Sequence, residues 1–201
     1  SALAKVFLSR GVGVSGSDVQ SSNITENLEK LGMLGSVGHK SGNVPKDADC
    51  LVYTVAVESN NPEIKYAISI GIPVFSYPEM LGVISWEFFT IAIAGTHGKT
   101  TTTNMIGKIL TDAGLRPLVI AGADLQKGDK MYGGGKYFVV EACEYRRSFL
   151  SIHPNIAVIT NIDDDHLDYY KNREDIESAF SEFVSNLKEG GRAIKDFQNP
   201  R

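Results

Sequence analysis

A glycine-rich turn between an apolar run and a helical run carries the residues best suited to chemistry. The turn follows the apolar run 91–94 and reads Gly95-Thr96-His97-Gly98-Lys99-Thr100-Thr101. Two glycines allow a tight turn whose backbone N–H groups face inward, at the positive end of a following helix. Such a turn binds phosphate oxygens, and lysine and threonine beside it can contact terminal phosphates and Mg²⁺. We therefore expect a phosphate site built on Lys99 and Thr100.

The turn is a shortened form of the usual phosphate loop, because Ile93 stands where that pattern has a glycine. A Gly-Lys-Thr sequence that merely caps a helix is the alternative. The order of apolar strand, glycines, lysine, hydroxyls and helix is the order that phosphate binding needs, and it favours the phosphate site.

Two later segments could bring acids and a histidine to the same place. The apolar run 137–140 ends in Glu141, and the run 155–162 leads into Asp163-Asp164-Asp165-His166. Carboxyl ends of parallel strands meet at one edge of a sheet, so Glu141 could hold Mg²⁺ near the phosphates. On the residues alone, Glu141 could equally end an ordinary strand, the three acids could form a solvated turn, and His166 could be a surface or capping residue.

Alternating strand-like and helical runs predict an α/β fold with parallel strands. We expect strands at 11–18, 50–55, 72–76, 91–94, 117–121, 137–141 and 155–162, and helices at 1–10, 23–32, 61–71, 99–113 and 173–188. Residues 1–88 would form a Rossmann-like domain with a parallel sheet. Residues 89–201 would form part of a P-loop ATPase-type domain, also with a parallel sheet.

The helix expected at 23–32 makes two detailed predictions. Asn23 and Glu26 would form a capping box at its start. Ile24, Leu28 and Leu31 would form the stripe that packs into the core.

Composition limits the classes of partner. The 201 residues carry a net charge of −4, which argues against non-specific nucleic-acid binding. We find no apolar run that could span a bilayer and no secretory signal. The two cysteines, Cys50 and Cys143, lack metal-ligand spacing and suit free thiols in a reducing compartment. We expect a cytoplasmic protein with neither nucleic-acid nor membrane partners.

The turn at 95–102 resembles the ATP-binding loop of the Mur ligases, the amide-forming enzymes of peptidoglycan synthesis. Two more stretches share that resemblance: Glu141-Ala142-Cys143-Glu144 and the signature Thr160-Asn161-Ile162-x-x-Asp165-His166-Leu167-Asp168. The chain departs from the family pattern at Cys143 and Arg146, where the family commonly has Asp. A histidine between Thr and Gly, as at His97, resembles the loop of the family's alanine-adding and peptide-recycling branches.

The resemblance implies an ADP-forming acid–amino-acid ligase that uses ATP and Mg²⁺ to join L-alanine to UDP-N-acetylmuramate. It implies catalytic roles for Lys99, Glu141 and His166, and metal binding by Thr100, Glu141 and His166. ATP would contact Gly95, Thr96, His97, Gly98, Lys99, Thr100, Thr101 and Asn161. Asp18, which ends the predicted strand 11–18, and Thr54 would contact the nucleotide sugar, although Asp18 also suits a simple turn.

Two other functions stay open at this point. A recycling ligase would join a tripeptide to the same nucleotide sugar, and a non-catalytic module would bind nucleotide without forming an amide. The resemblance also implies a first strand before residue 1 and further parts after residue 201. We therefore expect residues 1–201 alone to bind ATP–magnesium without catalysing the reaction.

Overall fold

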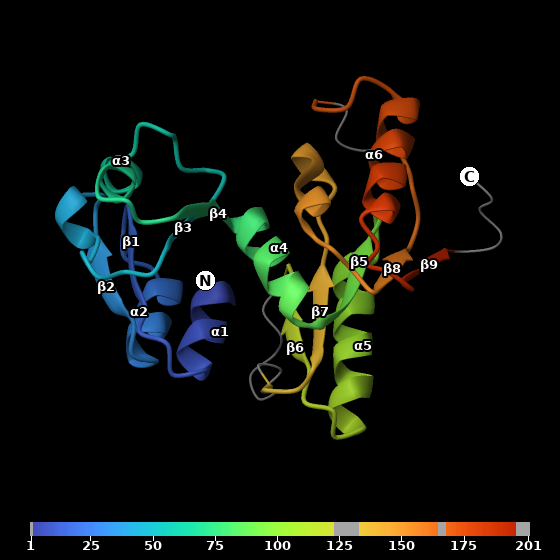
Figure 1. Ribbon diagram of the computed structural model, residues 1–201, viewed down its shortest axis with the longest axis horizontal. Coiled ribbons are helices and arrows are strands. Elements are labelled where there is room, and N and C mark those ends of the chain that lie inside the picture. Colours follow the sequence, from blue (N-terminus) through green and yellow to red (C-terminus); the bar gives the residue numbers. More distant parts are fainter. Residues whose placement is uncertain (1, 123–132, 165–167, 196–201) are drawn as a thin grey trace. The chain divides into compact units, whose positions relative to one another are not determined.

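The computed structural model describes residues 2–122, 133–164 and 168–195. The chain divides into two compact units, residues 1–80 and 81–201, which we describe separately (Figure 1). The division falls inside helix α4 (Tyr77–Glu87), which therefore contributes to both units. None of the helices in the described ranges is long and apolar enough to cross a membrane.

The first unit is built from short helices and two pairs of parallel strands. In chain order its elements are α1 (Ala2–Ser9), β1 (Ser15–Asp18), α2 (Asn23–Lys30), β2 (Leu34–Val37), η1 (Ser41–Asn43), β3 (Leu51–Tyr53), α3 (Pro62–Ser69) and β4 (Val74–Ser76). Strand β1 pairs with β2, and β3 pairs with β4. The α/β class and the parallel pairing are confirmed, although the strands are shorter than the sequence predicts.

Helix α2 differs from its prediction at both the cap and the buried stripe. Ser22, not Asn23, is the N-cap: the Ser22 hydroxyl accepts from the Thr25 N–H, and the Ser22 N–H donates to the Thr25 hydroxyl at 2.8 Å. The predicted box is wrong because Ser22, whose backbone is extended, precedes the first helical residue and exchanges hydrogen bonds with Thr25 instead.

The stripe prediction for α2 is also wrong at two of its three positions. Leu28 is buried, whereas Ile24 and Leu31 are more than half exposed. Strands β1 and β2 read Ser-Gly-Ser-Asp and Leu-Gly-Ser-Val, so they offer few apolar side chains for a full stripe to pack against. Helical periodicity identified the helix, but the neighbouring strands decide which of its apolar residues become buried.

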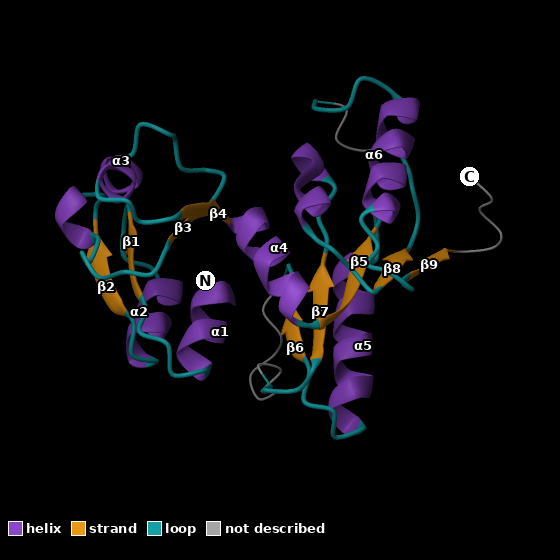
Figure 2. Cartoon of the chain, viewed as in Figure 1, coloured by secondary structure: helices purple, strands orange, loops and turns teal. Residues whose placement is uncertain are grey.

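The second unit is a five-stranded parallel sheet with helices packed against it (Figure 2). Its elements after α4 are β5 (Phe89–Ala94), α5 (Lys99–Asp112), β6 (Leu118–Ile120), β7 (Tyr137–Glu141), η2 (Tyr145–Ser151), β8 (Ile156–Ile159), α6 (Arg173–Ser185) and β9 (Arg192–Lys195). The strand order is β6-β7-β5-β8-β9, so β5 lies at the centre. Strand β9, which the sequence does not predict, is an exposed edge strand.

The core of the second unit surrounds β5. Ile91 and Ile93 pack against Val119 and Val139, and α5 adds apolar side chains from one side. Register places Ile93 beside Glu141 and Ala94 beside Ile159. The carboxyl ends of β5, β7 and β8 therefore meet at one edge of the sheet, where the segments that follow them lie together.

Candidate functional site

The turn after β5 has a backbone conformation that only glycine tolerates at its first residue. Gly95 has φ +133°, and a Cβ built there would lie 2.1 Å from the Thr160 Oγ1 atom. Gly98 has φ +81° and is the N-cap residue from which α5 begins. The predicted strand–turn–helix is confirmed, and it sets the turn against the positive end of a helix of 14 residues.

Residues after β8 brace this turn from the neighbouring strand. The Asn161 side-chain carbonyl accepts from the His97 N–H at 2.9 Å, and its amide donates to the His97 carbonyl at 3.1 Å. The Thr160 hydroxyl donates to the same carbonyl at 2.6 Å. Both polar groups of Asn161 are thus used to hold the backbone of the turn.

Thr96 is fixed by the same segment and is largely buried. Its N–H donates to the main-chain carbonyl of Asn161 at 3.1 Å, and its hydroxyl accepts from the Asp163 N–H at 2.9 Å. The N–H groups of Thr96 and His97 are thus used to hold the turn. The backbone N–H groups available for a phosphate are those that follow, at the start of α5.

Glu141 and Thr100 meet at this edge. The Thr100 hydroxyl donates to Glu141 Oε2 at 2.8 Å, and the Gly122 N–H donates to the same oxygen at 2.7 Å. A hydroxyl and a carboxylate are hard oxygen ligands, and Mg²⁺ typically takes one or two from protein and the rest from water and phosphates. Among the described residues, no group of three or more His, Cys, Asp or Glu side chains is placed to hold a metal ion.

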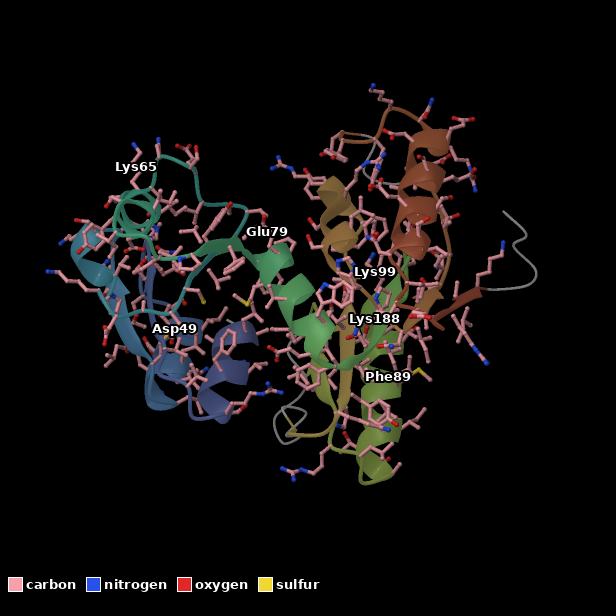
Figure 3. The ribbon with its side chains drawn as sticks, viewed as in Figure 1. Asp49, Lys65, Glu79, Phe89, Lys99 and Lys188 are labelled. Atoms are coloured by element: carbon pink, nitrogen blue, oxygen red, sulfur yellow. The ribbon has the colours of Figure 1, made fainter. Side chains whose placement is uncertain are left out.

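Lys99 lies at the same edge of the sheet (Figure 3). It donates to the carbonyls of Gly95 and Thr96 and forms a 3.0 Å ion pair with Glu144. The exposed fractions of the two paired side chains are 13% and 4%. Sequence reasoning gave Glu144 no role, although a buried lysine in this turn requires a nearby counter-ion.

The two residues that depart from the family pattern, Cys143 and Arg146, both lie in the segment after β7. Cys143 is exposed, and the Arg146 guanidinium lies 5.5 Å from the centre of the Tyr145 ring. Arg146 and Arg147 both have positive φ, a conformation that costs free energy in residues other than glycine. Arg147 is held there by 2.7 Å contacts to Asp175 and Glu182.

The other residues predicted for the site lie in the following places. Thr101 is exposed in the first turn of α5. Asp18 ends β1 and Thr54 follows β3, each at the carboxyl end of a parallel strand in the first unit. Asp165 and His166 lie outside the described residues.

The first unit also holds a polar network that the sequence did not reveal. The Ser17 hydroxyl donates to Glu63 Oε2 at 2.7 Å and lies 2.9 Å from His39 Nδ1. Glu63 Oε1 accepts from the Asn43 amide at 2.6 Å. Its members come from β1, η1, α3 and the loop before η1, so spacing along the chain could not have linked them.

Comparison with known proteins covers both units. The model of the Mur ligase family catalytic domain matches residues 1–89, and that of the Mur ligase middle domain matches residues 93–201. The UDP-N-acetylmuramate–L-alanine ligase of Acetivibrio thermocellus is 48% identical over 197 residues, which are 96% of this chain and 42% of that protein. The corresponding ligase of Desulforamulus reducens is 43% identical and covers 100% of this chain and 44% of that protein.

Solved structures of ligases are also similar to this chain. The UDP-N-acetylmuramate–alanine ligase of Thermotoga maritima has a TM-score of 0.80 and 30% identity, covering 99% of this chain and 46% of that one. The ligase from Neisseria meningitides that acts on L-alanyl-gamma-D-glutamyl-meso-diaminopimelate, at 24% identity and a TM-score of 0.81, shares the fold. The chain spans less than half the length of the curated relatives described here. Two matched domain models and a shared fold establish that this chain belongs to the Mur ligase family.

Proposed function

We propose that this chain takes part in the ATP-dependent joining of L-alanine to UDP-N-acetylmuramate, with release of ADP. The observation that carries the proposal is the meeting of Lys99, Thr100 and Glu141 at one sheet edge, with Thr100 and Glu141 in a 2.8 Å contact. The names of the relatives, at 43–48% identity, support the choice of substrates.

In the proposed reaction, ATP phosphorylates the carboxylate of the nucleotide sugar to give an acyl phosphate. The alanine amine then attacks the carbonyl carbon of this acyl phosphate, and inorganic phosphate leaves from the tetrahedral intermediate to form the amide. Within residues 95–101, the backbone N–H groups that do not already donate to Asn161 would bind the phosphates together with the Lys99 ammonium. Stabilising the charge on the transferred phosphoryl group is the main catalytic task in such transfers.

Magnesium is part of the same proposal. Thr100 and Glu141 would hold one ion, and His166 would hold a second. Bound Mg²⁺ neutralises negative charge on the phosphates during transfer. Asn161, whose side chain braces His97, would position the loop around the nucleotide.

The two domains would divide the substrates. Residues 89–201 would bind ATP, and residues 1–88 would bind the nucleotide sugar, with Asp18 and Thr54 at the carboxyl ends of parallel strands. Ligands of open α/β sheets generally bind outside those ends, which supports this assignment.

Substrate-dependent ADP release by the intact protein tests the proposal. ADP formation should require ATP, UDP-N-acetylmuramate and L-alanine together, and a tripeptide should not replace alanine. Turnover with the tripeptide alone would instead identify a recycling ligase. Binding of ATP without formation of any amide would identify a non-catalytic module. Residues 1–201 alone should bind ATP and release no ADP.

A further inference from the structure

The Lys99 ammonium has no hydrogen left for a phosphate in the structure. An ammonium has three N–H donors. Those of Lys99 are directed to the Gly95 carbonyl, the Thr96 carbonyl and Glu144 Oε1. A phosphate oxygen can therefore bind Lys99 only by replacing one of these three acceptors.

Of the three acceptors, the carboxylate is the one suited to leave. The two carbonyls belong to the turn itself, whose backbone is fixed by the contacts of Thr96 and His97 with the segment after β8. Glu144 reaches Lys99 through a side chain with rotatable bonds. Its charge also has the same sign as phosphate, so the two anions cannot share the ammonium without repulsion.

The backbone of Glu144 is held by a buried tyrosine. The Tyr170 hydroxyl donates to the Glu144 carbonyl at 2.5 Å, and Tyr170 is almost fully buried. Burial raises the pKa of Tyr170 to about 12, so this hydroxyl keeps its proton at physiological pH. The movement that would free Lys99 is therefore a rotation of the Glu144 side chain rather than a shift of its backbone.

We propose that Glu144 is the counter-ion that positions Lys99 before nucleotide binds, and that the phosphates of the nucleotide displace it. This inference rests on the proposed function, because it requires that the turn bind ATP. Glu144 acts through Lys99 and is a positioning residue. Part of the attraction between Lys99 and phosphate is spent on breaking the buried pair, and the carboxylate gives up its ion pair with Lys99 when nucleotide binds.

Glu144→Gln in the intact protein tests the exchange. Gln keeps an oxygen acceptor for Lys99 but removes the charge, so less free energy is lost when phosphate replaces it. The dissociation constants of ATP and ADP, measured by isothermal titration calorimetry, should fall on the order of tenfold. Glu189→Gln is the matched control, because Glu189 is exposed after α6, and it should leave both constants unchanged.

Thermal unfolding without nucleotide gives a second measurement that does not depend on binding. If the pair positions Lys99, the changes in unfolding free energy for Glu144→Gln and Lys99→Met should not add in the double variant. Additive changes would overturn the inference. So would unchanged or weaker ATP binding by Glu144→Gln in a protein whose wild type binds ATP. If the wild type fails to bind ATP, the proposed function itself is wrong.

Discussion

The side-chain amide of Asn161 forms hydrogen bonds to the backbone of His97 through both its oxygen and its nitrogen. The carbonyl oxygen accepts from the His97 N–H at 2.9 Å, and the amide donates to the His97 carbonyl at 3.1 Å. This is how a neighbouring strand would hold a peptide unit, although the two residues are 64 positions apart. The shape of the turn therefore depends on a side chain from the segment that follows β8.

Asn161→Asp should weaken nucleotide binding. The substitution removes the donor to the His97 carbonyl and adds a negative charge beside the phosphate site. Loss of this hydrogen bond and the added repulsion should raise the dissociation constant of ATP by roughly tenfold or more, as titration calorimetry would measure. Asn23→Asp, an exposed change in the first unit, should have no such effect. Equal affinities for the two variants would contradict a bracing role for Asn161.

Gly95→Ala should disrupt the turn more than a comparable change at the other end of α5. Gly114, with φ +74°, has nothing within 4 Å of a built Cβ, so Gly114→Ala carries only backbone strain of about 1–2 kcal/mol. At Gly95 a methyl group would also lie 2.1 Å from the Thr160 hydroxyl oxygen. We expect a larger loss of unfolding free energy for Gly95→Ala in urea titrations, together with loss of ATP binding. Similar losses for both variants would show that the close approach is unimportant.

Glu141→Gln should separate metal binding from phosphate binding. The amide can still accept from Thr100 and Gly122, but it is a weaker magnesium ligand. The concentration of Mg²⁺ that half-saturates ADP release should rise at least about tenfold. ATP binding in the presence of a chelator should change little, because the turn and Lys99 remain. An unchanged magnesium requirement would exclude Glu141 as a ligand.

Asp175→Asn should reduce stability in a pH-dependent way. The Lys171 N–H and then the Arg147 guanidinium hold the pKa of Asp175 below its ordinary value of 3.8. A depressed pKa in the folded state stabilises the protein above the ordinary value, and this contribution is lost as the pH falls through the depressed one. Wild type should therefore be more stable than Asp175→Asn at pH 7, and urea titrations at decreasing pH should show the difference shrinking below about pH 4. Glu174→Gln, its exposed neighbour, should show no comparable trend.

The local sequence was enough to predict most elements of the second unit. Strand β5, the turn and α5 follow directly from an apolar run, two glycines and helical spacing. Strand β9 could not be predicted, because Arg-Ala-Ile-Lys is short and has two charged ends, and only pairing with β8 makes it a strand. In the first unit, the exposure of Ile24 and Leu31 depends on the Ser and Gly residues of adjacent strands.

The site was predictable for residues whose chemistry suits a phosphate site and whose strands end at the same edge of the sheet. Thr100 and Glu141 were expected to meet, because both follow parallel strands that end at one edge of the sheet, and the structure brings them together. The pairing of Lys99 with Glu144 was not expected, because the turn of η2 that directs Glu144 inward includes two positive-φ arginines that no sequence rule anticipates. The magnesium and nucleotide-sugar assignments remain predictions.

The contacts between the turn and the segment after β8 also impose an order on events during synthesis. Residues 95–98 leave the ribosome some sixty positions before Thr160 and Asn161, which hold their backbone. Domains fold during translation as their parts become available, and contacts over long sequence separations form late. The nascent chain can therefore not complete the turn at residues 95–98 until β8 has emerged and taken its place beside β5.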